Sequence, residues 1–195
     1  MHEATLSTRT RLDADFAPAA PQLADIGSTA DMILKKAVYF CARKLGTDSP
    51  ETAMECLHRH DSAAIGYLHY SMVSQLAEYL AALDDDIRAV YVYDFDATPD
   101  DVALGQAIFP ALVHVIVWTG RRTSALNSLI AAAARALTEQ YAAMIGLPEL
   151  RHLLDVQVID DTDVHQRRGY GSLLTSAQFR PVKVWECGPD DDQRD

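Results

Sequence analysis

Cysteine and long apolar runs are both scarce in this chain of 195 residues. Its three cysteines, Cys41, Cys56 and Cys187, are widely spaced and form no Cys-x-x-Cys pair. Reduced thiols are therefore expected rather than a disulfide framework. The densest strand-like run, Ala111–Trp118, is only eight residues long, whereas a membrane-spanning helix needs about 20 apolar residues.

Basic charge is scarce as well. The chain has 17 Lys and Arg against 28 Asp and Glu, so its net charge is −11. Nucleic acids and anionic membrane surfaces are bound by basic patches, and neither is an expected partner here. The first residues contain no apolar stretch typical of a secretory signal. We therefore expect a cytoplasmic protein that binds neither nucleic acid nor membrane.

The apolar residues, 49% of the chain, are distributed in a way that predicts four parts. Residues 1–27 have no sustained apolar period and are predicted to be a flexible arm. Residues 28–85 repeat apolar positions at helical spacing and are predicted to be a helical region packed on the core. Residues 86–187 change to strand patterns and form the predicted α/β core domain. Residues 188–195 are an acidic tail.

Three helices are predicted in the region before the core. Their expected starts are at Ser28 or Thr29, at Ser49 with Pro50 in the first helical position, and at Asp61 or Ser62. Each start has a side chain that can accept a hydrogen bond from the first turn. The third helix is expected to end near Leu83.

Four strands and one long helix are predicted in the core domain. The strands are expected at 89–93, 112–118, 153–159 and 182–185, and the helix at 121–145. This order indicates an α/β fold. Its sheet would be four-stranded, parallel or mixed, with a long helix after the second strand and an N-terminal three-helix region before it.

Polar residues end three of these strands. Asp94 and Asp96 follow the first strand, Thr119 follows the second, and the pair Asp160-Asp161 follows the third. In parallel strands these ends would meet at one edge of the sheet, where open α/β folds place ligands. Converging carboxylates repel one another, and a divalent cation such as Mg²⁺ would relieve that repulsion.

This order of motifs resembles the haloacid dehalogenase-like phosphohydrolases. The resemblance implies that Asp94 is a nucleophile and metal ligand, and that Asp96 is the general acid and base. It also implies that Thr119 holds a phosphate oxygen, and that Asp160 and Asp161 position Mg²⁺. The expected function is then a Mg²⁺-dependent phosphoryl transfer or phosphatase-like activity on a small phosphorylated substrate.

A second resemblance concerns the order of elements, which is similar to that of minimal nucleotidyltransferases. It implies that Asp155 occupies the position of their third carboxylate, while Leu112 and His114 occupy the positions of their paired acids. Without that acidic pair the chain would be a non-catalytic ligand-binding or interaction protein. Both functional hypotheses stay open at this point.

Strand alternation adds a candidate ligand face. Tyr91 and Tyr93 share one side of the first strand, His114 and Trp118 one side of the second, and Asp155 one side of the third. The opposite sides are nearly all apolar, as in a sheet that is covered on one face. The polar and aromatic side would be a ligand face, a surface covered by the N-terminal helices, or a contact between two copies. A homo-oligomer is therefore also expected.

Overall fold

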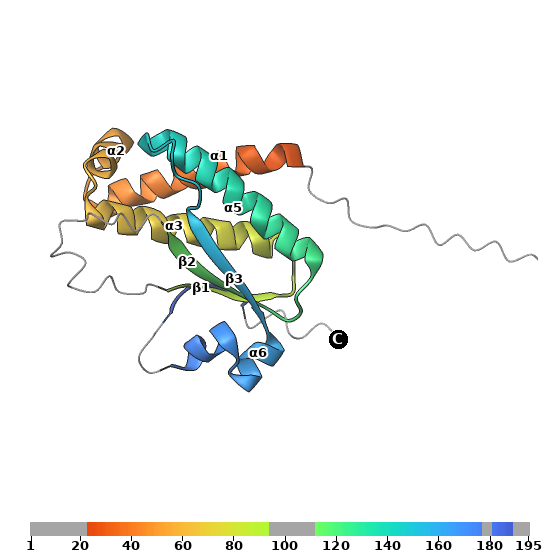
Figure 1. The fold of residues 1–195 in the computed structure, drawn as a ribbon. Helices are drawn as coiled ribbons and strands as arrows, with labels where there is room; N and C mark the ends of the chain where they lie inside the picture. The colour runs from red at the N-terminus through yellow and green to blue at the C-terminus, as the bar shows by residue number, and fades with distance from the viewer. Residues whose placement is uncertain (1–22, 94–111, 177–180, 189–195) are drawn as a thin grey trace, which may run out of the picture.

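A computed structural model describes residues 23–93, 112–176 and 181–188 of the chain, with only the backbone described for residues 23–25. Figure 1 shows the helices α1 (Leu23–Lys44), α2 (Pro50–His58), α3 (Ser62–Ala81), α5 (Ser124–Ile145) and α6 (Asp161–Gln166), the 3₁₀ helix η1 (Gly169–Thr175), and the strands β1 (Ile87–Tyr93), β2 (Val113–Thr119), β3 (Leu154–Asp160) and β4 (Val182–Glu186). The predicted α/β class is confirmed, with three helices before the strands and a long helix after β2.

The four strands form one mixed sheet in the order β3-β2-β1-β4. The strands β2 and β3 are parallel, and the long helix α5 connects them. The strand β1 runs antiparallel to both of its neighbours, β2 and β4. The carboxyl end of β1 therefore lies beside the amino end of β2, at the opposite end of the strands from the carboxyl ends of β2 and β3.

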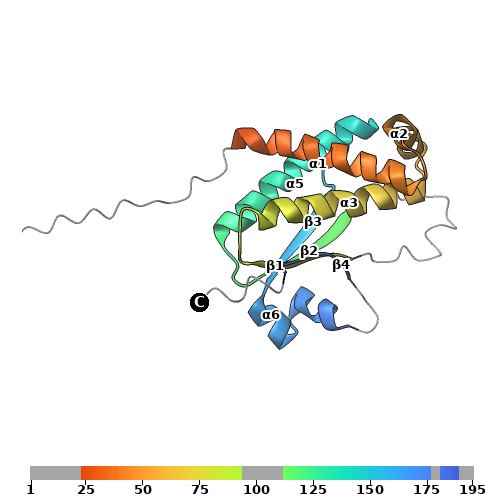
Figure 2. The ribbon, with the colours of Figure 1, turned by 180° about the vertical axis from the view of Figure 1, so that it is seen from behind.

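The sheet has helices on both faces. Long helices cover one face, and short helices cover part of the other. The long helices α1, α3 and α5 lie over the face that we call the inner face, and α6 with η1 lies against the other, outer face (Figures 1 and 2). Val90, Val115 and Val117 belong to the core beneath the long helices and are at most 1% exposed. Because side chains alternate along a strand, the residues between them face outward.

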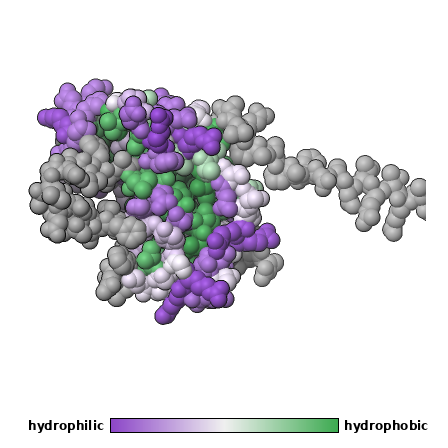
Figure 3. Space-filling view, viewed as in Figure 1, coloured by the Kyte–Doolittle hydropathy of each residue, from purple (hydrophilic) through white to green (hydrophobic). Residues whose placement is uncertain are grey.

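The cover of the inner face thins toward the β3 edge. Val156 and Val158 of β3 are only half-buried, whereas Val115 and Val117 of the adjacent strand are fully buried. Figure 3 shows hydrophobic residues at the centre of the molecular surface that carries β3 and α5, between hydrophilic patches. The hydrophobic core therefore reaches the surface along this edge strand.

Most predicted helix ends are confirmed by their capping contacts. The Ser49 hydroxyl accepts the Thr52 N–H at 3.3 Å, and the Asp61 carboxylate accepts the Ala64 N–H at 2.9 Å. Gly146 ends α5 with a φ of 72°, a left-handed conformation that favours glycine. Each of these signals depends on a few neighbouring residues.

The predicted start of the first helix at Ser28 or Thr29 is wrong. The helix α1 begins at Leu23, so Ser28 lies inside it, and residues 23–27 are not part of an arm. Leu23 and Ala24 are good helix formers and no proline follows them before the predicted start, so the helix extends backward. The rest of the predicted arm, residues 1–22, lies outside the described residues. The helix α3 ends at Ala81, two residues before the predicted Leu83.

A buried polar pair connects α3 and α5. The Nε2 atom of His69 lies 3.2 Å from the hydroxyl of Tyr141, and both residues are buried. Burial lowers the pKa of His69 to about 4, because an imidazolium would lose its hydration there. Burial likewise raises the pKa of Tyr141 to about 12. Both side chains are therefore neutral in the folded protein at neutral pH.

The first prediction concerns the pH dependence of folding stability. The pKa of His69 is lower in the folded state, about 4, than the ordinary value of 6.5, so the unfolded chain binds more protons between these values. The contribution of neutral His69 is fully present above pH 6.5 and is lost as the pH falls toward 4. We expect this residue alone to cost about 2 kcal/mol between pH 7.5 and pH 5.

Urea denaturation at both pH values measures this cost, with His69→Gln as the comparison. The glutamine retains a group that can hydrogen-bond Tyr141 and does not titrate. The wild type should lose about 2 kcal/mol more than the variant, since the other ionisable groups act equally on both. Equal losses in the two proteins would show that the buried imidazole does not govern this pH range.

Candidate functional site

The outer face of the sheet gathers the five residues of the predicted ligand face. Tyr91 and Tyr93 come from β1, His114 and Trp118 from β2, and Asp155 from β3. They alternate with valines of the inner face in each strand. Their common side was predictable from alternation alone, but their order across the sheet depends on strand register.

The register places Tyr93, His114 and Asp155 in one line across three strands, which we call the outer-face row. Tyr93 pairs with His114 across β1 and β2, and His114 pairs with Asp155 across β2 and β3. The Nδ1 atom of His114 lies 3.1 Å from Oδ2 of Asp155, and these side chains are 20% and 35% exposed. The other carboxylate oxygen, Oδ1, accepts a hydrogen bond from Gln157 Nε2 at 2.8 Å. The Asp155 carboxylate is therefore held in place from two sides.

The outer-face row has aromatic surroundings. The Tyr93 ring centroid lies 5.1 Å from that of His114 and 5.9 Å from that of Tyr170 in η1. Burial, and then hydrogen bonding with Tyr170, raises the pKa of Tyr93. Half-buried Tyr91 lies beside Lys183 of β4, and burial raises its pKa despite that cation. The row thus combines ring faces with a polar imidazole and carboxylate.

The segment α6–η1 covers part of the outer face. Ile116 and Ile159 are buried beneath it and pack against Val164 and Leu173, among other apolar side chains. Gly171 permits this packing, because a Cβ atom there would lie only 2.5 Å from the carbonyl oxygen of Asp163. The outer face therefore has a small core of its own next to the row.

The helix α6 was not predicted from the sequence. Its start is a capping box, in which the side chains of Asp160 and Asp163 accept hydrogen bonds from each other's backbone N–H groups at 3.0 and 3.3 Å. The spacing Asp-x-x-Asp after a strand is a helix-start signal of the same type as Ser-x-x-Glu. This spacing could have revealed the helix.

A second cluster of polar residues lies at the carboxyl ends of β2 and β3. Thr119 pairs with Asp160 across the two parallel strands, so the sheet brings together these two predicted site residues. The Thr119 side chain is fully buried, and its hydroxyl lies 3.2 Å from the carbonyl oxygen of Asp86 and 3.3 Å from that of Arg121. The hydroxyl proton is thus directed to backbone carbonyls within the fold.

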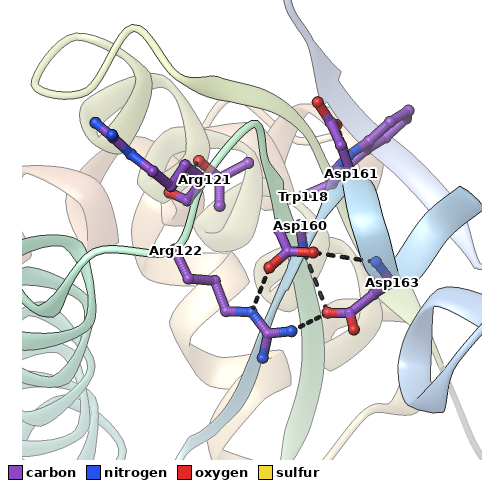
Figure 4. A network of polar contacts seen from close by, with 7 residues as sticks. Trp118, Arg121, Arg122, Asp160, Asp161 and Asp163 are labelled. Atoms are coloured by element: carbon purple, nitrogen blue, oxygen red, sulfur yellow. Dashed lines mark hydrogen bonds and ion pairs between the residues drawn. The ribbon is translucent and has the colours of Figure 1, made fainter.

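Asp160 is held by a cation as well as by its capping contacts. Arg122 Nε lies 3.1 Å from Asp160 Oδ2, and the same guanidinium contacts the Asp163 carboxylate (Figure 4). The Asp163 N–H, followed by the Arg122 guanidinium, lowers the pKa of Asp160. Arg122 therefore joins the loop after β2 to the start of α6.

Asp161 contacts Trp118, whereas Asp160 contacts Arg122. Oδ1 of Asp161 accepts a hydrogen bond from Trp118 Nε1 at 2.8 Å, and Figure 4 shows it turned toward the indole and away from Arg122. Asp160 and Asp161, the expected pair of Mg²⁺ ligands, thus each have a contact within the fold. No group of three or more His, Cys, Asp or Glu side chains that could hold a metal ion occurs among residues 23–93, 112–176 and 181–188.

The predicted first motif, Asp94 and Asp96, lies outside the described residues. The last described residue before it is Tyr93, which pairs with His114 near the amino end of β2. Thr119 lies five positions further along β2, a separation of about 16 Å at ~3.3 Å per residue. The carboxyl end of β1, Tyr93, therefore belongs to the outer-face row and lies far from Thr119 and Asp160.

No protein-family model matches the chain, and no curated protein or solved structure is significantly similar to it. A function can therefore be inferred only from the residues and geometry of the chain itself. Two polar groups enter that inference, the outer-face row and the cluster of Arg122 with Asp160 and Asp163.

The second prediction separates the capping role of Asp160 from its ion pair with Arg122. Asp160→Ala removes both contacts and should lower the free energy of unfolding by about 1 kcal/mol, the usual cost of losing an N-cap. Asp160→Ser retains a capping oxygen and removes only the charge. It should cost less than half as much, because exposed ion pairs contribute little.

Urea denaturation of the two variants gives this comparison. Equal losses would mean that the ion pair, and not the cap, is the main contribution of Asp160. An alanine variant as stable as the wild type would contradict the structural role of this residue altogether.

Proposed function

We propose that this chain is a non-catalytic, nucleotidyltransferase-like protein that binds a small ligand on its outer face. The observation that supports this proposal is the meeting of His114 and Asp155 at 3.1 Å, with the ring of Tyr93 beside them. These two residues stand at positions where the resemblance implies metal-binding carboxylates. Their contact makes the outer-face row the polar group best suited to contact a ligand.

The imidazole of His114 changes what the row can do. Carboxylates that converge on one point need a divalent cation to offset their repulsion. In this row a single carboxylate has an imidazole as its neighbour, and Nδ1–H of His114 can donate to Asp155. The row is thus stable without a metal ion, and ligand binding by it would not require Mg²⁺.

The surroundings of the row favour a flat, uncharged ligand. The half-buried rings of Tyr91 and His114 offer faces on which a heteroaromatic ring can stack. The ring of Tyr93 is only 5% exposed and packs against that of His114. The one lysine beside these rings, Lys183, is paired with Glu186 at 2.6 Å. Among the described residues, a phosphate group would therefore meet the carboxylate of Asp155 without an unpaired lysine nearby, so a nucleoside fits better than a nucleotide.

The third prediction is nucleoside binding at the outer-face row. Adenosine, guanosine, cytidine and uridine are added in turn to the ¹⁵N-labelled chain while its backbone amide spectrum is recorded. At least one of them should shift the amides of Tyr93, His114 and Asp155. Addition of EDTA should leave the shifts unchanged, since the row holds only one carboxylate.

Matched variants test whether the polar row causes the binding. His114→Gln and Asp155→Asn each remove one partner of the pair and should weaken binding at least tenfold. His152→Gln makes the same change at an exposed histidine before β3 and should leave binding unchanged. If none of the four nucleosides shifts the row, the proposed ligand class is wrong.

The phosphatase-like activity stays a prediction alongside this proposal. The second and third motifs of that hypothesis pair at Thr119 and Asp160, while Asp94 and Asp96 lie outside the described residues.

The fourth prediction tests the phosphatase-like activity directly. If Asp94 is a nucleophile, the wild type should hydrolyse a generic phosphate ester in Mg²⁺, and Asp94→Asn should abolish the reaction. Absence of turnover in the wild type would leave the non-catalytic proposal as the better account.

A further inference from the structure

An open groove is lined by residues of α1 and α3. Figure 2 shows these two helices on the near side of the helical layer. The volume of the groove is about 540 Å³, and it is lined by Phe40, Lys44, Ala63, Gly66, Tyr67 and Tyr70. Ligand pockets commonly have volumes of ~300–1,000 Å³. This groove shares no residue with the outer-face row.

The groove has aromatic walls that are open to solvent. Tyr67 and Tyr70 are 37% and 41% exposed. The ring centroids of Phe40 and Tyr70 lie 6.1 Å apart, and Lys44 Nζ lies 5.5 Å from the Phe40 centroid. Exposed tyrosines around a groove are typical of protein interfaces, where aromatic residues contribute much of the binding energy.

The helix α3 has a composition that fits a covered surface. Glu78 is the only charged residue among its 20 residues. The exposed side of its first half carries Ala63, Gly66, Tyr67 and Tyr70, where a solvated helix normally carries charges. None of the described helices is long and apolar enough to cross a membrane. The exposed tyrosines and the lack of charge on this side of α3 are features of a surface that another protein covers.

We propose that the groove binds an amphipathic helix of another protein, through an apolar anchor side chain with acidic residues beside it. Gly66 leaves space for the anchor, because a Cβ atom built on it would have no atom within 4 Å. Within the part of the chain that the structure describes, Lys44 is the one charged residue that lines the groove. Lys36 is exposed and lies two turns before Lys44 on the same side of α1.

The charges favour such a partner over a second copy of the chain. A twofold contact would place the groove against itself, so that the same surface meets on both sides. Lys44 would then enter the interface from both copies, and no acidic side chain of the described residues lines the groove to pair with it. An acidic helix supplies the missing charge.

The fifth prediction tests this interface with two fluorescent 15-residue peptides and the full-length chain. Both peptides carry Leu, Leu and Phe at helical spacing, one with Glu and the other with Lys at the flanking positions. Fluorescence anisotropy should show that the acidic peptide binds at least tenfold more tightly. Gly66→Leu fills the groove, and Lys44→Glu reverses its charge, so each should weaken binding of the acidic peptide at least tenfold.

The control is Gly27→Leu, the same change at another helical glycine with nothing within 4 Å of its Cβ position. It should bind like the wild type, and neither leucine variant should unfold, since leucine favours a helix more than glycine does. Equal binding of the two peptides, no binding of either, or unchanged binding by Gly66→Leu would overturn the proposal. A wild-type dimer that Gly66→Leu converts to a monomer in sedimentation would also overturn it, because the occupant would be a second copy.

Discussion

The helices α1, α3 and α5 bury one face of the sheet, and this burial determines which residues of the strands point to solvent. Apolar burial gives roughly 25 cal/mol for each Å² removed from water, so this face dominates the stability of the fold. Side chains alternate along a strand, and a strand with Val90, Val115 or Val117 inward must turn its other residues outward. The polar and aromatic character of the outer face is thus a consequence of how the core is packed.

Strand direction then decides which outward residues can act together. The antiparallel pairing of β1 with β2 places Tyr93 next to His114 and distant from Thr119. The parallel pairing of β2 with β3 adds Asp155 to the same end of the sheet and places Asp160 at the other end. The two ends consequently have different chemistry. One carries the imidazole, carboxylate and aromatic rings, and the other carries carboxylates that cap α6 and pair with Arg122.

Features that depend on neighbouring residues could be predicted from the sequence, and features that depend on distant segments could not. The caps at Ser49 and Asp61 and the stop at Gly146 depend on a few neighbouring residues, and they were predicted. The shared side of Tyr91, Tyr93, His114, Trp118 and Asp155 also follows from alternation within each strand. Strand direction depends on how distant segments pack, and no local pattern states it. The contact between His114 and Asp155, 41 residues apart in sequence, therefore needed the three-dimensional structure.

The line of Tyr93, His114 and Asp155 across three strands is the feature on which the proposed function depends. Nuclear Overhauser effects between backbone protons of neighbouring strands test this line. Cross-strand signals should connect Tyr93 with His114 and His114 with Asp155. Signals that instead connect Tyr93 with Trp118 or Thr119 would mean that β1 runs parallel to β2. That result would contradict the outer-face row and would place the residues after β1 beside Thr119 and Asp160.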